Sequence, residues 1–177
     1  MWQGRRTWKV KVVHRADLVS DTHGLVRPEA LDALRGSDLI IIHCGDIGHP
    51  AVLEALRALS PVRATRGNND KGAWASSLPT YDVVAVGSHA IYAIHNLAEL
   101  DLDPADAGFI ALVSGHPHKP VIERCGKTLF ANPGSAGPRR FTMPVTVATL
   151  ALRSGLCEAK IVELALSHQS RNRGPSD

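Results

Sequence analysis

The sequence contains few cysteines and no long hydrophobic run. Three cysteines, Cys44, Cys125 and Cys157, are spread over 177 residues, and no two have C-x-x-C spacing. An odd number without that spacing argues against a disulfide framework and against a zinc ribbon. Free thiols are typical of a reducing compartment, so we expect a cytoplasmic protein. No stretch approaches 18 apolar residues, so no membrane-spanning helix is expected.

Most of the chain also lacks an excess of positive charge. The net charge is +3, but five basic residues and no acidic residue lie within the first 15 positions. The rest of the chain has 15 basic and 17 acidic residues. This balance argues against a dedicated nucleic-acid-binding protein.

The length and composition predict a single globular domain. Hydrophobic residues make up 44% of the chain and charged residues 21%, which is typical of soluble domains. We expect residues 14–166 to form the domain and residues 167–177 to form a disordered tail. Residues 1–13 are interpreted as a loose basic extension, with a basic arm that contacts an anionic partner as the alternative.

The hydrophobic pattern changes character at about residue 80. Before it, short apolar runs alternate with helical spacing, which predicts a mostly parallel sheet covered by helices. The expected elements there are strands at 15–20, 38–43 and 62–65, with helices at 28–35 and from 50 onward. After it, hairpin signals predict a mainly antiparallel β-rich half, with a short helix at 104–107. We therefore expect an α/β fold of two packed sheets with outer helices.

Side chains that bind metals gather directly after predicted strands. Residues i and i+2 of an extended chain project to the same side, so a D-x-H or H-x-H pair can hold one ion. In open α/β sheets, sites form beyond the carboxyl ends of the strands. The candidates occur in the order D-x-H, G-D, G-N, H and G-H-x-H, and they are Asp21, His23, Asp46, Asn68, His95, His116 and His118.

These seven side chains predict a site for two divalent ions. The set contains two carboxylates, one amide and four imidazoles, which suits Mn²⁺, Fe²⁺ or Zn²⁺. Seven ligands are too many for one ordinary site, and Asp46, between the two histidine-containing pairs in sequence, is the natural bridging ligand. Two ions about 3.5–4 Å apart are suited to in-line displacement at phosphorus.

The same motifs resemble those of the calcineurin-like metallophosphoesterases. The resemblance covers residues 15–165 and is strongest to the small YfcE-type phosphodiesterase branch of bacteria and archaea. It is carried by Ser20-Asp21-Thr22-His23-Gly24, Gly45-Asp46, Gly67-Asn68-Asn69-Asp70, His95, Gly115-His116-Pro117-His118-Lys119-Pro120 and Asn132-Pro133-Gly134-Ser135. It implies a four-layer α/β/β/α sandwich of two mixed sheets, with a metal-bridging hydroxide as the nucleophile.

The resemblance also implies a role for each ligand. It assigns one ion to Asp21, His23, Asp46 and His118, and the other ion to Asp46, Asn68, His95 and His116. Many members of the superfamily have a histidine directly after the Gly-Asn pair, where it acts on the leaving group. Here that position is Asn69, for which we expect a contact to a phosphate oxygen.

Other polar residues are interpreted more plainly. His43 lies inside a predicted strand, and His49 lies at a helix start, where it is the first candidate for a general acid if one exists. Arg139 and Arg140 could hold a phosphate, although exposed arginines are usually only solvated.

The sequence thus predicts a metal-dependent phosphodiesterase that hydrolyses a small phosphodiester or a nucleotide-like substrate. Mn²⁺ is the expected ion, with Zn²⁺, Fe²⁺ or Ni²⁺ as alternatives. The alternatives to this activity are a nuclease and a non-catalytic protein-binding scaffold on the same fold. The complete set of ligands favours the enzyme, and the sequence leaves the oligomeric state open.

Overall fold

Two five-stranded mixed sheets form the protein. The computed structural model describes residues 14–36, 40–153 and 155–166. The first sheet has the strand order β10-β9-β1-β2-β3. Its strands are β1 (His14–Val19), β2 (Ile40–His43), β3 (Val62–Ala64), β9 (Thr146–Arg153) and β10 (Leu156–Glu163). The second sheet has the order β4-β5-β6-β8-β7. Its strands are β4 (Tyr81–Val86), β5 (His89–Ile94), β6 (Ala111–Val113), β7 (Val121–Cys125) and β8 (Thr128–Asn132).

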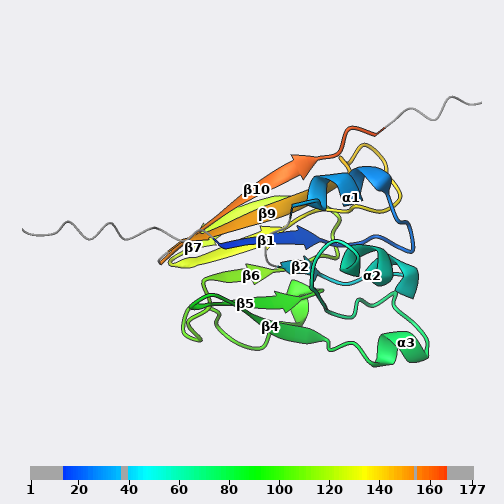
Figure 1. Ribbon diagram of the computed structural model, residues 1–177. Helices are drawn as coiled ribbons and strands as arrows, with labels where there is room; N and C mark the ends of the chain where they lie inside the picture. The colour runs from blue at the N-terminus through cyan, green and yellow to red at the C-terminus, as the bar shows by residue number, and fades with distance from the viewer. Residues whose placement is uncertain (1–13, 37–39, 154, 167–177) are drawn as a thin grey trace, which may run out of the picture.

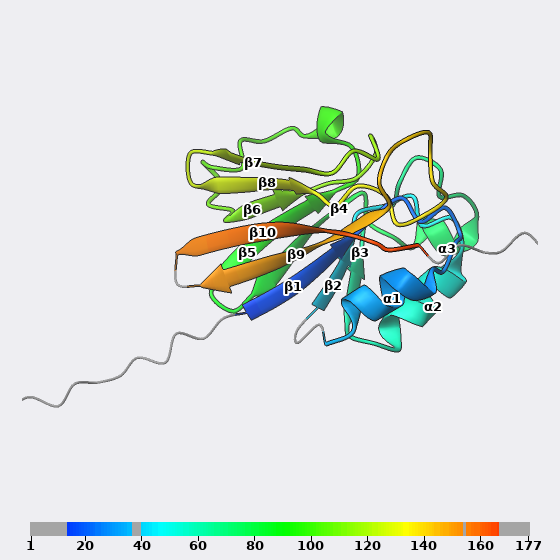
Figure 2. The ribbon, with the colours of Figure 1, turned by 90° about the horizontal axis from the view of Figure 1, so that it is seen from above.

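The helices pack on the outer face of the first sheet. They are α1 (Pro28–Leu34), α2 (Pro50–Arg57) and the short α3 (Ala73–Ser76), and Figures 1 and 2 show α1 and α2 beside β1–β3. Pro28 and Pro50 open their helices because the first turn needs no amide donor there. In α2, Val52, Leu53 and Leu56 form one apolar face that is buried against the sheet.

The main core lies between the two sheets. Alternate side chains of each strand point inward, as in Ala16 and Leu18 of β1 and Ile91 and Ala93 of β5. Ile91 is fully buried, and burying a side chain of this size stabilises the fold by about 1.5–3 kcal/mol. This packing fixes one sheet on the other.

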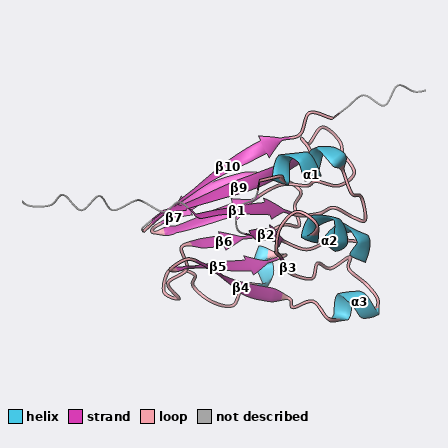
Figure 3. Cartoon of the chain, in the orientation of Figure 1, coloured by secondary structure: helices cyan, strands magenta, loops and turns pink. Residues whose placement is uncertain are grey.

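The predicted α/β sandwich of two packed sheets is confirmed, although its fourth layer is thin. The outer face of the second sheet is covered by a loop that contains the 3-10 turn η1 (Leu97–Glu99). Figure 3 shows how little helix lies on this side. Residues 104–107, predicted as a short helix, form hydrogen-bonded turns instead, closed by the amide of Ala107 on the carbonyl of Asp103.

The second half is mainly antiparallel, as predicted, but it also contains parallel pairs that the hairpin signals did not indicate. Strands β5, β6 and β8 pair in parallel, although β4 and β7 are antiparallel to their neighbours. A long loop carries the chain from the end of β5 back to the start of β6, so the two strands run in the same direction. Strands β1, β2 and β3 are parallel as well.

The carboxyl ends of these six parallel strands lie at one end of the sandwich, on the right in Figure 1. The expected extension at 1–13 and tail at 167–177 lie outside the described residues. In the described part of the chain, no helix has the length and hydropathy needed to cross a membrane.

Candidate metal centre

The first group of predicted ligands lies where β1 and β6 end. The Nε2 atoms of His23 and His118 are 3.2 Å apart, and Nε2 of His118 lies 3.3 Å from Oδ1 of Asp21. The two histidine rings are stacked, with their centroids 5.0 Å apart. These donor atoms are close enough to hold one ion.

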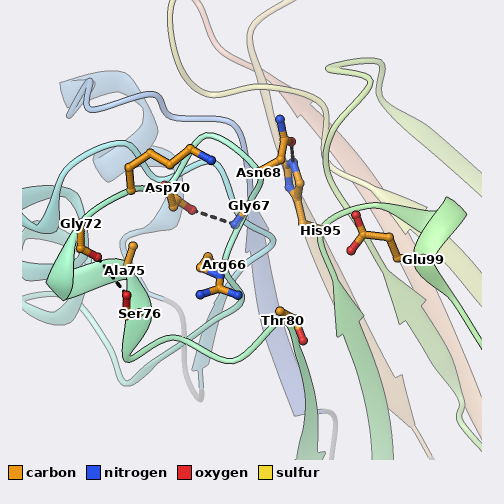
Figure 4. Close-up of a pocket in the computed structure, with 11 residues that line it drawn as sticks. Arg66, Gly67, Asn68, Asp70, Gly72, Ala75, Ser76, Thr80, His95 and Glu99 are labelled. Carbon is orange, nitrogen blue, oxygen red and sulfur yellow. Dashed lines mark hydrogen bonds between the residues drawn. The ribbon is translucent and has the colours of Figure 1, made fainter.

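The second group is built by β3, β5 and β6. Oδ1 of Asn68 lies 3.1 Å from Nε2 of His95 and 3.2 Å from Nδ1 of His116. Figure 4 shows Asn68 and His95 directed toward each other from separate strand ends. Asn68 and His116 are exposed, so the site is open to solvent.

Asp46 lies between the two groups. Its Oδ1 is 3.4 Å from Nε2 of His95, and its Oδ2 is 3.9 Å from Nε2 of His23. Each carboxylate oxygen therefore faces a different group, an arrangement that suits a bridging ligand. Asp21 also lies within reach of Asp46 and His95, so both carboxylates are central to the cluster. The structure thus brings all seven predicted side chains together.

The backbone at these residues adopts the left-handed conformation. Six described non-glycine residues have positive φ, and five of them are predicted ligands: Asp21 (53°), His23 (47°), Asp46 (54°), His116 (80°) and His118 (57°). This conformation is uncommon for non-glycine residues and gathers at functional sites, where the surroundings enforce it. The tight turns at these residues direct their side chains into one small volume.

Glycines before the ligands allow the strand ends to approach closely. A Cβ atom on Gly67 would lie 2.1 Å from Oδ1 of Asp46, and one on Gly45 would lie 2.6 Å from the ring of His95. Ligand side chains occupy the space that a larger residue would need. The glycines of the G-D and G-N motifs are therefore required by packing around the cluster.

The electrostatics of the first group fit a cation. Burial raises the pKa of Asp21 to about 7, with Asp46 adding to the effect. Oδ1 of Asp21, the atom that lies near Nε2 of His118, is buried without a hydrogen-bond partner, and such a group is costly unless a ligand satisfies it. Burial also lowers the pKa of His23, and lowers that of His118 to about 4, which keeps the imidazoles neutral as metal ligands must be.

Asn69 contacts Asp46 in this structure. Its side-chain amide donates to Oδ2 of Asp46 at 2.6 Å, and its backbone amide donates to Oδ1 at 2.9 Å. Burial opposes ionisation of Asp46, but these two hydrogen bonds and the nearby histidines bring its pKa below the ordinary value. Asn69 therefore orients the central carboxylate, and its expected contact to a phosphate oxygen stays a prediction.

Three histidines have structural partners. Nδ1 of His95 lies 2.7 Å from the carbonyl of Cys44 and donates to it, which leaves Nε2 free for an ion. His43 is buried beside Thr22, and burial lowers its pKa to about 3. Nδ1 of His49 accepts a hydrogen bond from the amide of Ala51 as the cap of α2.

Asp70 supports the site in a way that sequence reasoning missed. Its two oxygens accept hydrogen bonds from the amides of Gly48 and Gly67, each at 2.8 Å, so it joins the loops that carry Asp46 and Asn68. The only signal in the sequence was its place directly after Asn69 in the family motif. A cavity of about 440 Å³ opens beside this loop, lined by Asn68, Asp70, His95 and others (Figure 4).

Known proteins share both the sequence pattern and the fold. The calcineurin-like phosphoesterase superfamily domain matches residues 15–155. A probable metallophosphoesterase of Methanocaldococcus jannaschii is 32% identical over 160 residues, which is 83% of this chain and 80% of the relative.

Solved structures extend the likeness. A structure described as that of an archaeal phosphodiesterase has a TM-score of 0.69 at 21% identity, covering 84% of this chain and 99% of that one. The structure of the phosphoesterase YfcE of E. coli has a TM-score of 0.59 at 23% identity, covering 77% of this chain and 87% of that one. The structure of vacuolar protein sorting 29 of Cryptosporidium parvum has a TM-score of 0.68 at 19% identity, covering 86% of this chain and 98% of that one.

The resemblance predicted from the sequence is therefore confirmed. The motifs, the two packed sheets and the match over most of the chain agree with one another. This chain belongs to the calcineurin-like phosphoesterase superfamily, in which it resembles the YfcE-type branch.

Proposed function

We propose that the protein is a metal-dependent phosphodiesterase with a dinuclear centre. The observation that carries this proposal is the position of Asp46, whose two oxygens face two separate groups of donor atoms. Asp21, His23 and His118 would hold one ion with Asp46, and Asn68, His95 and His116 would hold the other. The neutral imidazoles, the amide and the buried carboxylates form a donor set that divalent transition metals prefer.

Ions held by these residues would lower the pKa of a bound water and offset negative charge on a phosphate. The chain's own residues prepare that chemistry. Asn69 and the carbonyl of Cys44 fix the orientation of Asp46 and His95. The exposed Asn68 and His116 leave one face open for a phosphate ester. Mn²⁺ is our first choice of ion, with Zn²⁺, Fe²⁺ or Ni²⁺ as alternatives.

We propose a small phosphodiester or a nucleotide-like molecule as the substrate. The cavity of about 440 Å³ beside Asn68 and His95 is lined by Arg66 and Lys71 as well as by Asp70 and Glu99. The similarity to an archaeal phosphodiesterase supports a diester. The three free cysteines support a reducing compartment such as the cytoplasm.

A protein-binding scaffold is the second candidate. It is favoured by the similarity of the fold to vacuolar protein sorting 29. The complete donor set argues for the enzyme, since a scaffold has no need for a buried, unpartnered carboxylate oxygen such as Oδ1 of Asp21.

Hydrolysis of bis(p-nitrophenyl) phosphate by the Mn²⁺-loaded protein tests the proposal, with p-nitrophenyl phosphate as the monoester comparison. We expect turnover of the diester, loss of turnover with EDTA, and recovery on adding Mn²⁺. No turnover of any diester by protein that verifiably holds two ions would favour the scaffold.

A further inference from the structure

Arg140 lies at the rim of the metal centre on the loop between β8 and β9. Its Nη2 atom is 3.5 Å from Nε2 of His23. Arg140 is thus a cation directed at the first group of ligands.

The loop that carries Arg140 is fixed to the strand end that carries Asp21. The hydroxyl of Ser135 donates to the carbonyl of Asp21 at 2.9 Å. The carbonyl of Gly137 accepts two hydrogen bonds, both 3.1 Å, from the guanidinium of Arg27. A Cβ atom on Gly137 would lie 2.3 Å from the carbonyl of Asp21, so the two segments are in direct contact. Arg140 is therefore held near the cluster by its backbone.

The guanidinium of Arg140 has little else to bind. In the described ranges it forms no salt bridge with a carboxylate. Its contact is to His23 Nε2, the atom that would bind an ion. That nitrogen cannot accept a hydrogen bond and donate its lone pair to a metal at once. Ion binding would therefore free the donors of Arg140. The neighbouring Arg139 differs, because its Nε donates to the carbonyl of Met143 in its own loop.

We propose that Arg140 forms an oxyanion subsite that binds a non-bridging phosphate oxygen of the substrate on the His23 side of the centre. This inference rests on the proposed function. A guanidinium presents paired N–H donors that match phosphate oxygens in geometry and charge. The same contact strengthens as charge develops on the phosphate oxygens in the transition state.

The test compares Arg140→Gln with Arg139→Gln, a matched variant that removes the adjacent arginine. Both are prepared as the full chain with Mn²⁺, and metal content is measured first. Binding of inorganic phosphate is then measured by calorimetry, and kcat/KM is measured with bis(p-nitrophenyl) phosphate. We expect Arg140→Gln to keep its ions, to bind phosphate about 10-fold more weakly, and to lose about 10²-fold in kcat/KM. Arg139→Gln should stay within about twofold of the wild type, because exposed side chains away from the site have small effects.

Arg140→Lys sharpens the result. It keeps the charge but loses the paired donors, so its kcat/KM should lie between the wild type and Arg140→Gln. Equal phosphate affinity and kcat/KM in the two glutamine variants would overturn the proposal. Loss of metal from Arg140→Gln would also overturn it, because Arg140 would then support the ions instead of the phosphate. Failure of the proposed function looks different: the wild type would turn over no diester, while the calorimetric comparison would still report on Arg140.

Discussion

The two ends of the sandwich use the same backbone conformation with different residues. At one end, which we call the turn edge, hairpin turns contain Gly87, Gly126 and Gly155, with φ of 59°, 57° and 75°. At the other, the site edge, the left-handed residues include Asp21, His23, Asp46, His116 and His118. Glycine adopts this conformation at no steric cost, whereas other residues lose about 1–2 kcal/mol each.

This difference shows that the site edge is less stable in its backbone because of its functional side chains. A glycine at each of these turns would relieve the steric strain, but it would supply no side chain to bind an ion. Buried Asp21 and Asp46 add like charges at close range, which a chain without ions must tolerate. We therefore expect the site edge to be the less stable end until a cation binds, and the following predictions test this contrast.

The largest effect is expected for Asp46→Ala. Because each Asp46 oxygen faces a different group of ligands, its loss should remove both ions and lower diester hydrolysis by at least about 10³-fold. His23→Ala should mainly weaken one ion. Metal content by mass spectrometry, alongside activity, checks both. His89→Ala, at the turn edge, is the control and should keep two ions. An Asp46→Ala protein with two tightly held ions would contradict the bridging role.

The second effect concerns the stability of the metal-free protein against pH. Burial raises the pKa of Asp21 from 3.8 to about 7. The folded state therefore binds the proton of Asp21 more tightly than the unfolded state does. The stabilisation that this proton provides is complete below pH 3.8 and is lost as the pH rises through about 7. Asp21→Asn, which cannot ionise, should be more stable than the wild type by a few kcal/mol at pH 8, and this gain should shrink toward pH 4.

Chemical denaturation in EDTA at several pH values measures that difference. The buried His43 and His118 have lowered pKa values, so they destabilise both proteins as the pH falls below about 6.5. The comparison of the two proteins cancels this background. Asp106→Asn, which removes an exposed carboxyl group, is the control. A gain that is independent of pH would mean that folding does not raise the pKa of Asp21.

A smaller effect is expected for Asn69→Ala. Its amide holds Oδ2 of Asp46, so its removal should raise the pKa of Asp46 and loosen the carboxylate. Partners of metal ligands typically contribute 10–100-fold to affinity, and we expect about 10-fold weaker Mn²⁺ binding in calorimetry. Asn96→Ala is the matched control, because that side chain caps η1. Unchanged Mn²⁺ affinity in Asn69→Ala would return Asn69 to the predicted role of contacting phosphate.

Much of the fold was predictable because apolar alternation and glycine turns are local signals. The hairpin around Gly87-Ser88 was placed to within one residue, and the helix opened by Pro28 ended one residue earlier than expected. The parallel pairing of β5, β6 and β8 was missed, since strand direction depends on where a long loop returns. The α3 helix was also missed, because four residues carry no periodic signal.

The gathering of the seven candidate side chains was predictable because their motifs follow the ends of successive strands, whereas their supporting contacts were not. Those contacts join residues that lie 22–117 positions apart in the chain: Asn69 with Asp46, Asp70 with Gly48, and Arg140 with His23. Nor did the sequence explain Asp17 inside a strand, where its partner is Arg15, at 2.9 Å. The left-handed backbone of the site residues could not be predicted either, since only the assembled strand ends enforce that conformation.

The smallest effect tests that backbone directly, in EDTA so that ion binding does not contribute. At His116, with φ of 80°, we compare His116→Gly with His116→Ala. Both lose the imidazole and its contact with Asn68, so their difference reports on the backbone alone. A Cβ at positive φ costs about 1–2 kcal/mol, and the extra freedom of glycine in the unfolded chain offsets part of that. His116→Gly should therefore be the more stable variant by about 1 kcal/mol.

Gly126→Ala, at the turn edge, should lose a similar amount of stability, because its φ of 57° is strained for alanine although the space around it is open. Ala85→Gly, on an exposed position of β4, should reverse the sign and lose about 0.5–1 kcal/mol. If His116→Ala were the more stable of the pair, the left-handed turn at the site edge would relax without its ligand, and the two ends of the sandwich would differ in chemistry but not in strain.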